Sequence, residues 1–89
     1  MTVAMTDDLA GAGWQTTEDG KAIDKVFRFA NFRDAMAWMT RVAFEAEAAD
    51  HHPEWRNVYN RVEVRLTTHD AGGLTQKDLD LATAIERLG

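Results

Sequence analysis

The clearest pattern in the chain is a stretch whose apolar residues recur at intervals of three and four. Its apolar positions are Phe32, Ala35, Met36, Met39, Val42, Ala43 and Ala46. This spacing predicts a long amphipathic helix. Asn31 is placed to cap the first turn, with Asp34 three residues later. The helix is expected to end near His51, because His52 precedes a proline and is therefore pushed out of the α region.

Other segments alternate apolar and polar residues, as half-buried strands do. Residues 22–30 predict one strand, in which Ile23, Phe27 and Phe29 share a side and Lys25 is the exception. Residues 58–67 predict a further antiparallel strand or strand pair, with Val58, Val62, Val64 and Leu66 on one side. The pattern of residues 14–17 predicts a short strand. The segment from Glu18 to Lys21 has Asp-Gly at its centre and predicts a hairpin turn.

The last segment predicts a second helix after the break at Gly72-Gly73. Thr75 is its expected cap, Asp78 occupies the third position, and the buried stripe is Leu81, Ala82, Ile85 and Leu88. Residues 6–12 predict a short helical turn. Together these elements indicate an α+β fold, an antiparallel four-stranded sheet with two to three helices packed on one face, in the order ββαββα. Residues 1–89 are expected to form a single domain.

Composition narrows the classes of function. The net charge of −5 argues against a nucleic-acid backbone as the direct partner. The chain has no Cys, which excludes thiolate chemistry, and no Ser, which excludes a serine nucleophile. No apolar run approaches the roughly 20 residues of a membrane span, and the first residues lack the features of a signal peptide. We expect a cytoplasmic protein without a membrane partner.

The three histidines, His51, His52 and His69, all fall at the ends of predicted elements. Side chains there can converge on a ligand without being packed into a core. Histidine gives and takes protons near neutral pH, and the His-His-Pro turn places two such residues where packing needs neither. The three are therefore interpreted as a candidate acid–base site. Truncating His51 or His69 is expected to change stability little.

Each neighbouring side chain has a plainer interpretation as well. Glu47 lies four residues before His51 and would fix its tautomer, but such a pair is often a solvated one at a helix end. Asp78 serves as a capping carboxylate, and Trp55 is either a core aromatic or a lid on a flat heterocycle. Three His with Glu47 and Asp50 would also suit zinc by ligand type. The sequence lacks H-x-x-x-H spacing, so metal-free acid–base chemistry is favoured.

Two motifs together carry a resemblance to a known family. The first is Glu47-x-x-Asp50-His51-His52-Pro53-Glu54-Trp55-x-Asn57-Val58-Tyr59-Asn60, and the second is Thr67-Thr68-His69-Asp70-x-Gly72-Gly73-Leu74-Thr75-x-x-Asp78. In this order and spacing they resemble the pterin-4a-carbinolamine dehydratase family. The likeness covers roughly residues 9–88. The segment before Trp14 is shorter than the family's usual first helix, so this helix is expected to be reduced or absent.

The resemblance implies a hydro-lyase, a 4a-hydroxytetrahydrobiopterin dehydratase of tetrahydrobiopterin recycling. Such an enzyme removes water from the 4a-carbinolamine to give quinonoid dihydropterin, using an acid at the hydroxyl and a base at a ring N–H. No metal or other cofactor is implied. The implied catalytic residues are His51, His52 and His69. The implied substrate-binding residues are Glu47, Asp50, His51, His52, Pro53, Trp55, Thr68, His69, Asp70, Ala71 and Asp78.

The resemblance also implies partners. Family members form tetramers built from dimers, which suits a small domain with an open sheet edge, and Trp38 and Phe44 are candidate contacts. Animal members also serve as dimerisation cofactors of a homeodomain transcription factor. A non-catalytic cofactor of this kind, an inactive pterin-binding paralogue and a carboxylate-rich metalloprotein are the alternatives.

Overall fold

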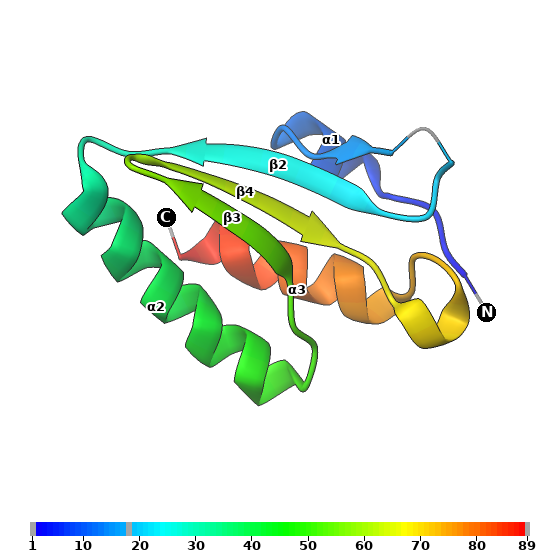
Figure 1. Cartoon of the computed structure of the whole chain (residues 1–89). Coiled ribbons are helices and arrows are strands. Elements are labelled where there is room, and N and C mark those ends of the chain that lie inside the picture. Colours follow the sequence, from blue (N-terminus) through cyan, green and yellow to red (C-terminus); the bar gives the residue numbers. More distant parts are fainter. Residues whose placement is uncertain (1, 18, 89) are drawn as a thin grey trace.

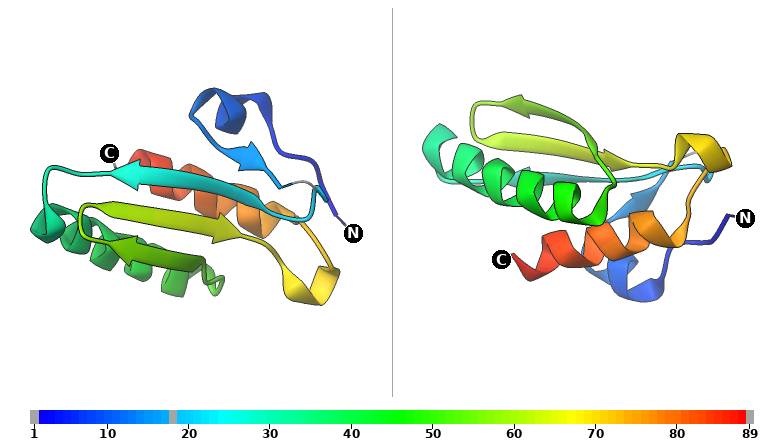
Figure 2. Two further views of the ribbon diagram at one scale, coloured as in Figure 1. Left: turned by 45° about the horizontal axis from the view of Figure 1, so that its top comes forward. Right: turned by 90° about the horizontal axis from the view of Figure 1, so that it is seen from below.

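A computed structural model describes residues 2–17 and 19–88 as one sheet covered by helices. The four strands form an antiparallel sheet in the order β1-β2-β4-β3. The elements are α1 (Asp7–Gly11), β1 (Gln15–Thr16), β2 (Ile23–Arg28), α2 (Phe32–Ala49), β3 (Glu54–Val58), β4 (Arg61–Leu66), η1 (His69–Ala71) and α3 (Gln76–Arg87). The helices α2 and α3 cover one face, with α1 beside α3 (Figures 1 and 2). This arrangement confirms the predicted fold class.

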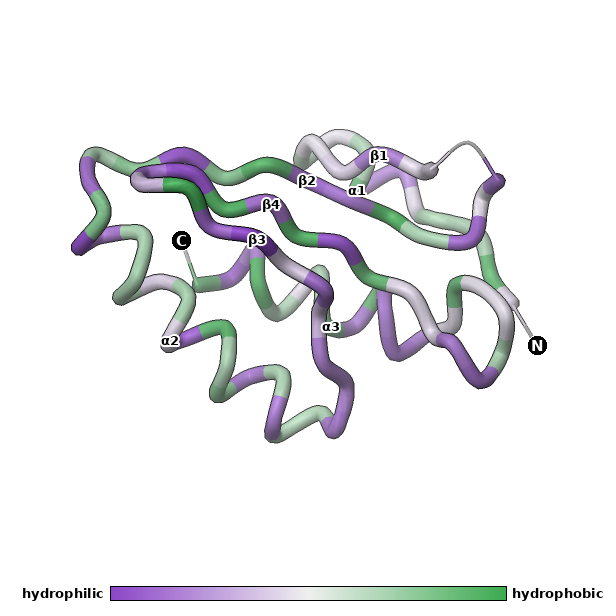
Figure 3. Tube along the Cα trace, viewed as in Figure 1, coloured by the Kyte–Doolittle hydropathy of each residue, from purple (hydrophilic) through white to green (hydrophobic). Residues whose placement is uncertain are grey.

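The two central strands form the floor of the core. β2 and β4 pair from Ile23 opposite Leu66 to Arg28 opposite Arg61. Their helix-facing positions are buried or half-buried, whereas the other face is mostly polar and open, and the hydropathy alternates along both strands (Figure 3). This alternation is what the sequence predicts for a half-buried sheet. The reduced first helix also forms, as α1, whereas Glu18 of the predicted hairpin turn lies outside the described residues.

The second alternating run proves to be two strands joined by a turn at Tyr59 and Asn60. β3 begins at Glu54 rather than near Val58, and the predicted grouping of Val58 with the buried valines is wrong. Val58 pairs with Arg61 on the open face and is 41% exposed. The turn carries no glycine; instead the Asn57 side-chain amide donates to the carbonyl oxygens of Tyr59 at 3.1 Å and Arg61 at 3.0 Å. Side-chain to backbone bonds of this kind favour a turn.

The long helix is capped as predicted, but it is rotated about its axis relative to the predicted stripe. The Asn31 side chain accepts a hydrogen bond from the backbone N–H of Asp34 at 2.8 Å. Phe32 and Met36 are 46% and 40% exposed, and Ala43 is exposed as well, so placing these three in the buried stripe was wrong. Trp38 is buried instead. Its ring packs on the sheet against two phenylalanines of the core side, which draws that flank of α2 inward.

Lys25, the exception in the alternation of β2, lies on the core side because it has partners there. Its Nζ donates to Glu86 Oε2 at 2.7 Å and to the carbonyl oxygen of Ala12 at 2.5 Å. The Trp14 indole N–H donates to the same Glu86 oxygen at 2.9 Å. The Lys25 and Glu86 side chains are only 18% and 28% exposed. This cluster fastens the N-terminal segment to α3 and to the sheet.

Replacing Glu86 by alanine is expected to lower the free energy of unfolding by about 1–3 kcal/mol, because the Trp14 indole N–H loses its acceptor and Lys25 Nζ keeps only the carbonyl oxygen of Ala12. Urea unfolding monitored by tryptophan fluorescence measures the change. The control is Glu45→Ala on the exposed surface of α2, for which a change within about 0.5 kcal/mol is expected. Equal stability of the two variants would contradict the role given to the Glu86 carboxylate.

Candidate functional site

The site begins where α2 ends. Asp50 takes the left-handed conformation with φ of 49°, and the backbone N–H of His51 bonds back to the carbonyl oxygen of Ala46 at 3.1 Å. The chain thereby leaves the helix with the His51 ring turned toward the start of α3. There Nε2 of His51 lies 2.5 Å from Oδ1 of Asp78. The His51 side chain is 11% exposed and the Asp78 side chain is completely buried.

The second oxygen of Asp78 receives two further hydrogen bonds. The Thr68 hydroxyl donates to Oδ2 at 2.8 Å, and the backbone N–H of Thr75 donates to the same atom at 2.9 Å. The predicted capping role of Asp78 at the start of α3 is therefore present. Capping explains the contacts of Oδ2 only, because Oδ1 is hydrogen-bonded to His51. A buried carboxylate needs such donors, since an unpaired one is costly.

Glu47 does not pair with His51, as its spacing had indicated. Its Oε1 lies 2.9 Å from Nε2 of His52, and both side chains are well exposed, at 79% and 60%. The reason is the left-handed turn at Asp50, which carries His51 toward α3 and leaves His52 lying back over the last turn of α2. The i,i+4 argument assumes a continuing helix, and the helix stops before His51.

His69 lies in η1, on the other side of the site. Its Nε2 is 3.4 Å from Oε2 of Glu54, and its side chain is 82% exposed. The neighbouring Thr68 bonds to Asp78, so the two histidine motifs meet at two points. His51 is connected to the Thr68 segment through Asp78, which bonds to both. His69 contacts Glu54, the residue that follows Pro53. The structure brings the two motifs together, but among residues 2–17 and 19–88 no hydrogen bond joins one histidine to another.

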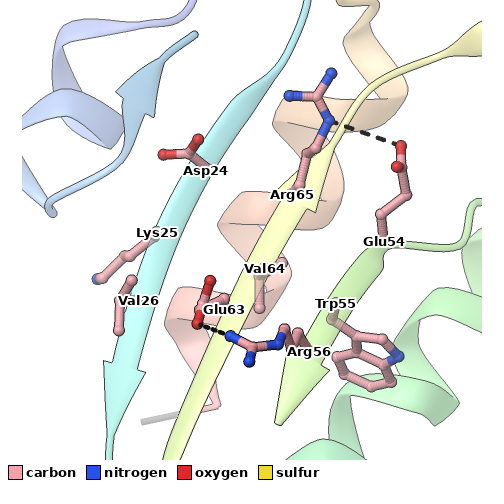
Figure 4. Close-up of a pocket in the computed structure, with 9 residues that line it drawn as sticks. All are labelled: Asp24, Lys25, Val26, Glu54, Trp55, Arg56, Glu63, Val64 and Arg65. Atoms are coloured by element: carbon pink, nitrogen blue, oxygen red, sulfur yellow. Dashed lines mark hydrogen bonds and ion pairs between the residues drawn. The ribbon is translucent and has the colours of Figure 1, made fainter. Parts of the chain in front are cut away.

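The remaining predicted residues surround these contacts. Trp55 is half-buried on β3 and packs against the core, with its ring turned toward α2 (Figure 4). Pro53 is half-buried, and Asp50 is exposed at the helix end. A hollow of about 430 Å³ lies on the open face of the sheet, between the Arg56–Glu63 and Arg65–Glu54 ion pairs (Figure 4). None of the three histidines lines it.

A different hollow, of about 620 Å³, lies against the predicted substrate-binding segment. It is lined by Thr68, Asp70 and Ala71 on one side and by the first residues of α3 on another. Asp70 and Ala71 are exposed, and Gly72 ends η1 with φ of 71°, a conformation that glycine adopts readily. The hollow is therefore open to solvent beside residues 68–71, and none of the three histidines lines it.

Sequence reasoning missed how Asp78 is held. The Thr68 hydroxyl and the Thr75 N–H come from separate segments, and nothing in the local pattern shows that both reach one carboxylate. A usable signal was present, because Asp78 falls within the apolar face of its helix. Within the described part of the chain, no group of three or more metal-ligating side chains is gathered. No helix among those residues is long and apolar enough to cross a membrane.

Comparisons with known proteins point to one family. A sequence model of the family described as pterin 4 alpha carbinolamine dehydratase matches residues 2–88. A protein of Rhodopseudomonas palustris, provisionally named pterin-4-alpha-carbinolamine dehydratase, is 58% identical over 86% of this chain and 76% of its own length. One from Novosphingobium aromaticivorans, with the same provisional name, is 62% identical over 82% of this chain and 76% of its own length.

A solved structure extends the likeness to the fold. The crystal structure of a protein from Brucella melitensis, described as a transcriptional coactivator/pterin dehydratase, superposes with a TM-score of 0.85 at 37% identity. The superposition covers 97% of this chain and 98% of the other. With a family match over nearly the whole chain, close relatives and a shared fold, this chain belongs to the pterin-4a-carbinolamine dehydratase family of hydro-lyases.

Proposed function

We propose that the chain dehydrates 4a-hydroxytetrahydrobiopterin to quinonoid dihydropterin by general acid–base catalysis, in tetrahydrobiopterin recycling in the cytoplasm. The observation that carries the proposal is the His51 ring, held by a buried carboxylate beside the segment that bears His69. A histidine fixed by a carboxylate is a common way to prepare a ring for proton transfer. Family membership supplies the substrate class.

The hydrogen bonds of Asp78 indicate which nitrogen of His51 reacts. Oδ2 already accepts two donors, so the ionised carboxylate uses Oδ1 to accept the Nε2–H of the ring. In the neutral ring Nδ1 then carries a lone pair. Within residues 2–17 and 19–88 it makes no hydrogen bond. We assign Nδ1, the ring nitrogen that does not face Asp78, as the atom that exchanges a proton with the pterin.

The reaction needs one proton delivered and one removed. The hydroxyl leaves C4a as water with a proton from a protonated acid, and a base takes the N–H proton of the pterin ring. The two transfers leave the protein's charge unchanged overall. His51, His52 and His69 are the proposed acid and base groups, each transfer contributing about 10²–10⁴-fold to the rate. In the proposed complex Glu47 positions His52, Pro53 and Trp55 flank the pterin, and residues 68–71 meet its polar edge.

Replacing His51 by glutamine should separate chemistry from stability. Glutamine can offer an N–H to Asp78 in place of Nε2, but it cannot exchange a proton. We expect turnover to fall roughly 10–10³-fold. His51→Ala should in addition lower the free energy of unfolding by about 1–3 kcal/mol, because Asp78 loses a donor. This revises the sequence-based expectation of a small stability change at His51.

His52→Ala and His69→Ala serve as the comparison, since both rings are well exposed and their loss should change stability by no more than about 0.5 kcal/mol. Turnover of His69→Ala is expected to fall with that of His51→Gln, whereas His52→Ala should chiefly weaken substrate binding. Dehydratase kinetics and thermal melts of all variants test these expectations for turnover and stability. Near-wild-type rates in every folded variant would show that the assigned site is wrong.

Activity is expected to persist without a transition metal, because the proposed steps are proton transfers between side chains and substrate. The measurement is turnover before and after exhaustive chelation, with elemental analysis of the same samples. A loss of turnover on chelation that zinc restores would favour the metalloprotein alternative instead.

The chain is expected to assemble as a tetramer, a dimer of dimers, at micromolar concentration. The Trp38 ring is buried within the chain and is no longer a candidate contact, whereas Phe44 is 71% exposed on α2. β3 has β4 as its sheet neighbour on one side only, so it presents an open edge. Sedimentation equilibrium should show the tetramer, with smaller species for Phe44→Ser. A 10.0 kDa species alone would refute the assembly.

The binding-module alternative makes a different prediction for the same preparation. The Brucella melitensis protein is described as a transcriptional coactivator as well as a pterin dehydratase. A folded, pure protein that binds a pterin without accelerating dehydration would support a non-catalytic role for this chain.

A further inference from the structure

The Thr68 hydroxyl lies at the junction of the two histidine motifs. It donates to Asp78 Oδ2 at 2.8 Å and lies 2.8 Å from the hydroxyl of Thr75. Asp78 in turn holds His51 through its other oxygen. Thr68 therefore lies two hydrogen bonds from the His51 ring, and it directly precedes His69 in the chain.

The direction of each hydrogen bond follows from the groups involved. An ionised carboxylate accepts only, so the single hydroxyl proton of Thr68 is used on Asp78. The Thr68 oxygen then accepts the proton of Thr75, which fixes the order Thr75 to Thr68 to Asp78. Oδ1 is left to accept the Nε2–H of His51. The chain of bonds has one consistent arrangement, and in it the reactive nitrogen of His51 is Nδ1.

We propose that Thr68 is a positioning residue for the dehydration, acting through Asp78 on the orientation and tautomer of the His51 ring. The proposal rests on the proposed function for its kinetic part, whereas its tautomer part can be tested without substrate. Removing the hydroxyl would leave Oδ2 with the Thr75 N–H alone and free the carboxylate to rotate. The ring would then sample orientations in which Nδ1 does not face the pterin.

The test compares Thr68→Val, which removes the hydroxyl at nearly constant shape, with Thr68→Ser, which keeps it. Thr67→Val is the control, because the neighbouring Thr67 hydroxyl donates to the carbonyl oxygen of Lys21 and is not among the hydrogen-bond partners of Asp78 in the described part of the chain. We expect kcat of Thr68→Val to fall by about 10-fold with a smaller change in KM, since an orienting group acts mainly on the proton-transfer step. Thr68→Ser should recover most of the kcat that Thr68→Val loses, and Thr67→Val should remain within about twofold of wild type.

The spectroscopic arm uses nitrogen-15 NMR of the histidine rings at a pH where they are neutral. In the wild-type protein His51 should show a protonated Nε2 and an unprotonated Nδ1, and Thr68→Val should show a mixture of tautomers. The opposite tautomer in the wild type would overturn the proposal even if Thr68→Val did not fold. An unchanged tautomer and unchanged kcat in folded Thr68→Val would also overturn it, as would an equal loss in Thr67→Val.

The two arms separate this proposal from the proposed function. A wild-type protein without dehydratase activity, but with the His51 tautomer fixed and dependent on the Thr68 hydroxyl, would reject the function and support the positioning. An active wild type in which Thr68→Val and Thr68→Ser both lose the same activity would support the function and reject the hydroxyl as the cause.

Discussion

The buried carboxylate of Asp78 is the constraint around which this end of the molecule is built. A charged group with no exposed surface is stable only when each oxygen finds donors. Here the donors come from three separate segments: His51 after α2, Thr68 after β4 and Thr75 before α3. Satisfying Asp78 therefore requires that α2, the sheet and α3 all reach their final positions. The same requirement places the histidine motifs together.

This coupling explains why a residue with an ordinary local role is also central to the site. A capping carboxylate at the start of a helix is normally exposed, and it gains from the helix dipole and from the free backbone N–H groups. At Asp78 the capping bond uses one oxygen and fixes the carboxylate's orientation, so that the other oxygen points at His51. The cap therefore stabilises α3 and orients the ring through one rigid group.

The opposite end of the core is organised by a different polar contact. Glu86, in the last turn of α3, accepts from Trp14 and Lys25 and so joins the N-terminal segment to the sheet. The helix α3 thus carries a partly or fully buried carboxylate near each end, and each holds a segment distant in the sequence. Between them the contacts of α3 with α2 and the sheet are apolar. Leu9 of the short helix α1 and Trp14, which follows that helix, are both buried in the core.

Sequence alone determined the features that depend on neighbours along the chain. The strand alternation of residues 22–30, the Asn31 cap, the break at Gly72-Gly73 and the two histidine motifs all follow from local spacing and conformational preference. Tertiary structure decided which partner each side chain meets. Because the chain turns at Asp50, Glu47 pairs with His52 rather than with His51. Packing of Trp38 on the sheet sets which side of α2 is buried. Asp78 pairs with a histidine 27 residues away in the chain. Such contacts depend on how the layers pack, because a local pattern shows that a side chain is polar or apolar but not which distant group will satisfy it.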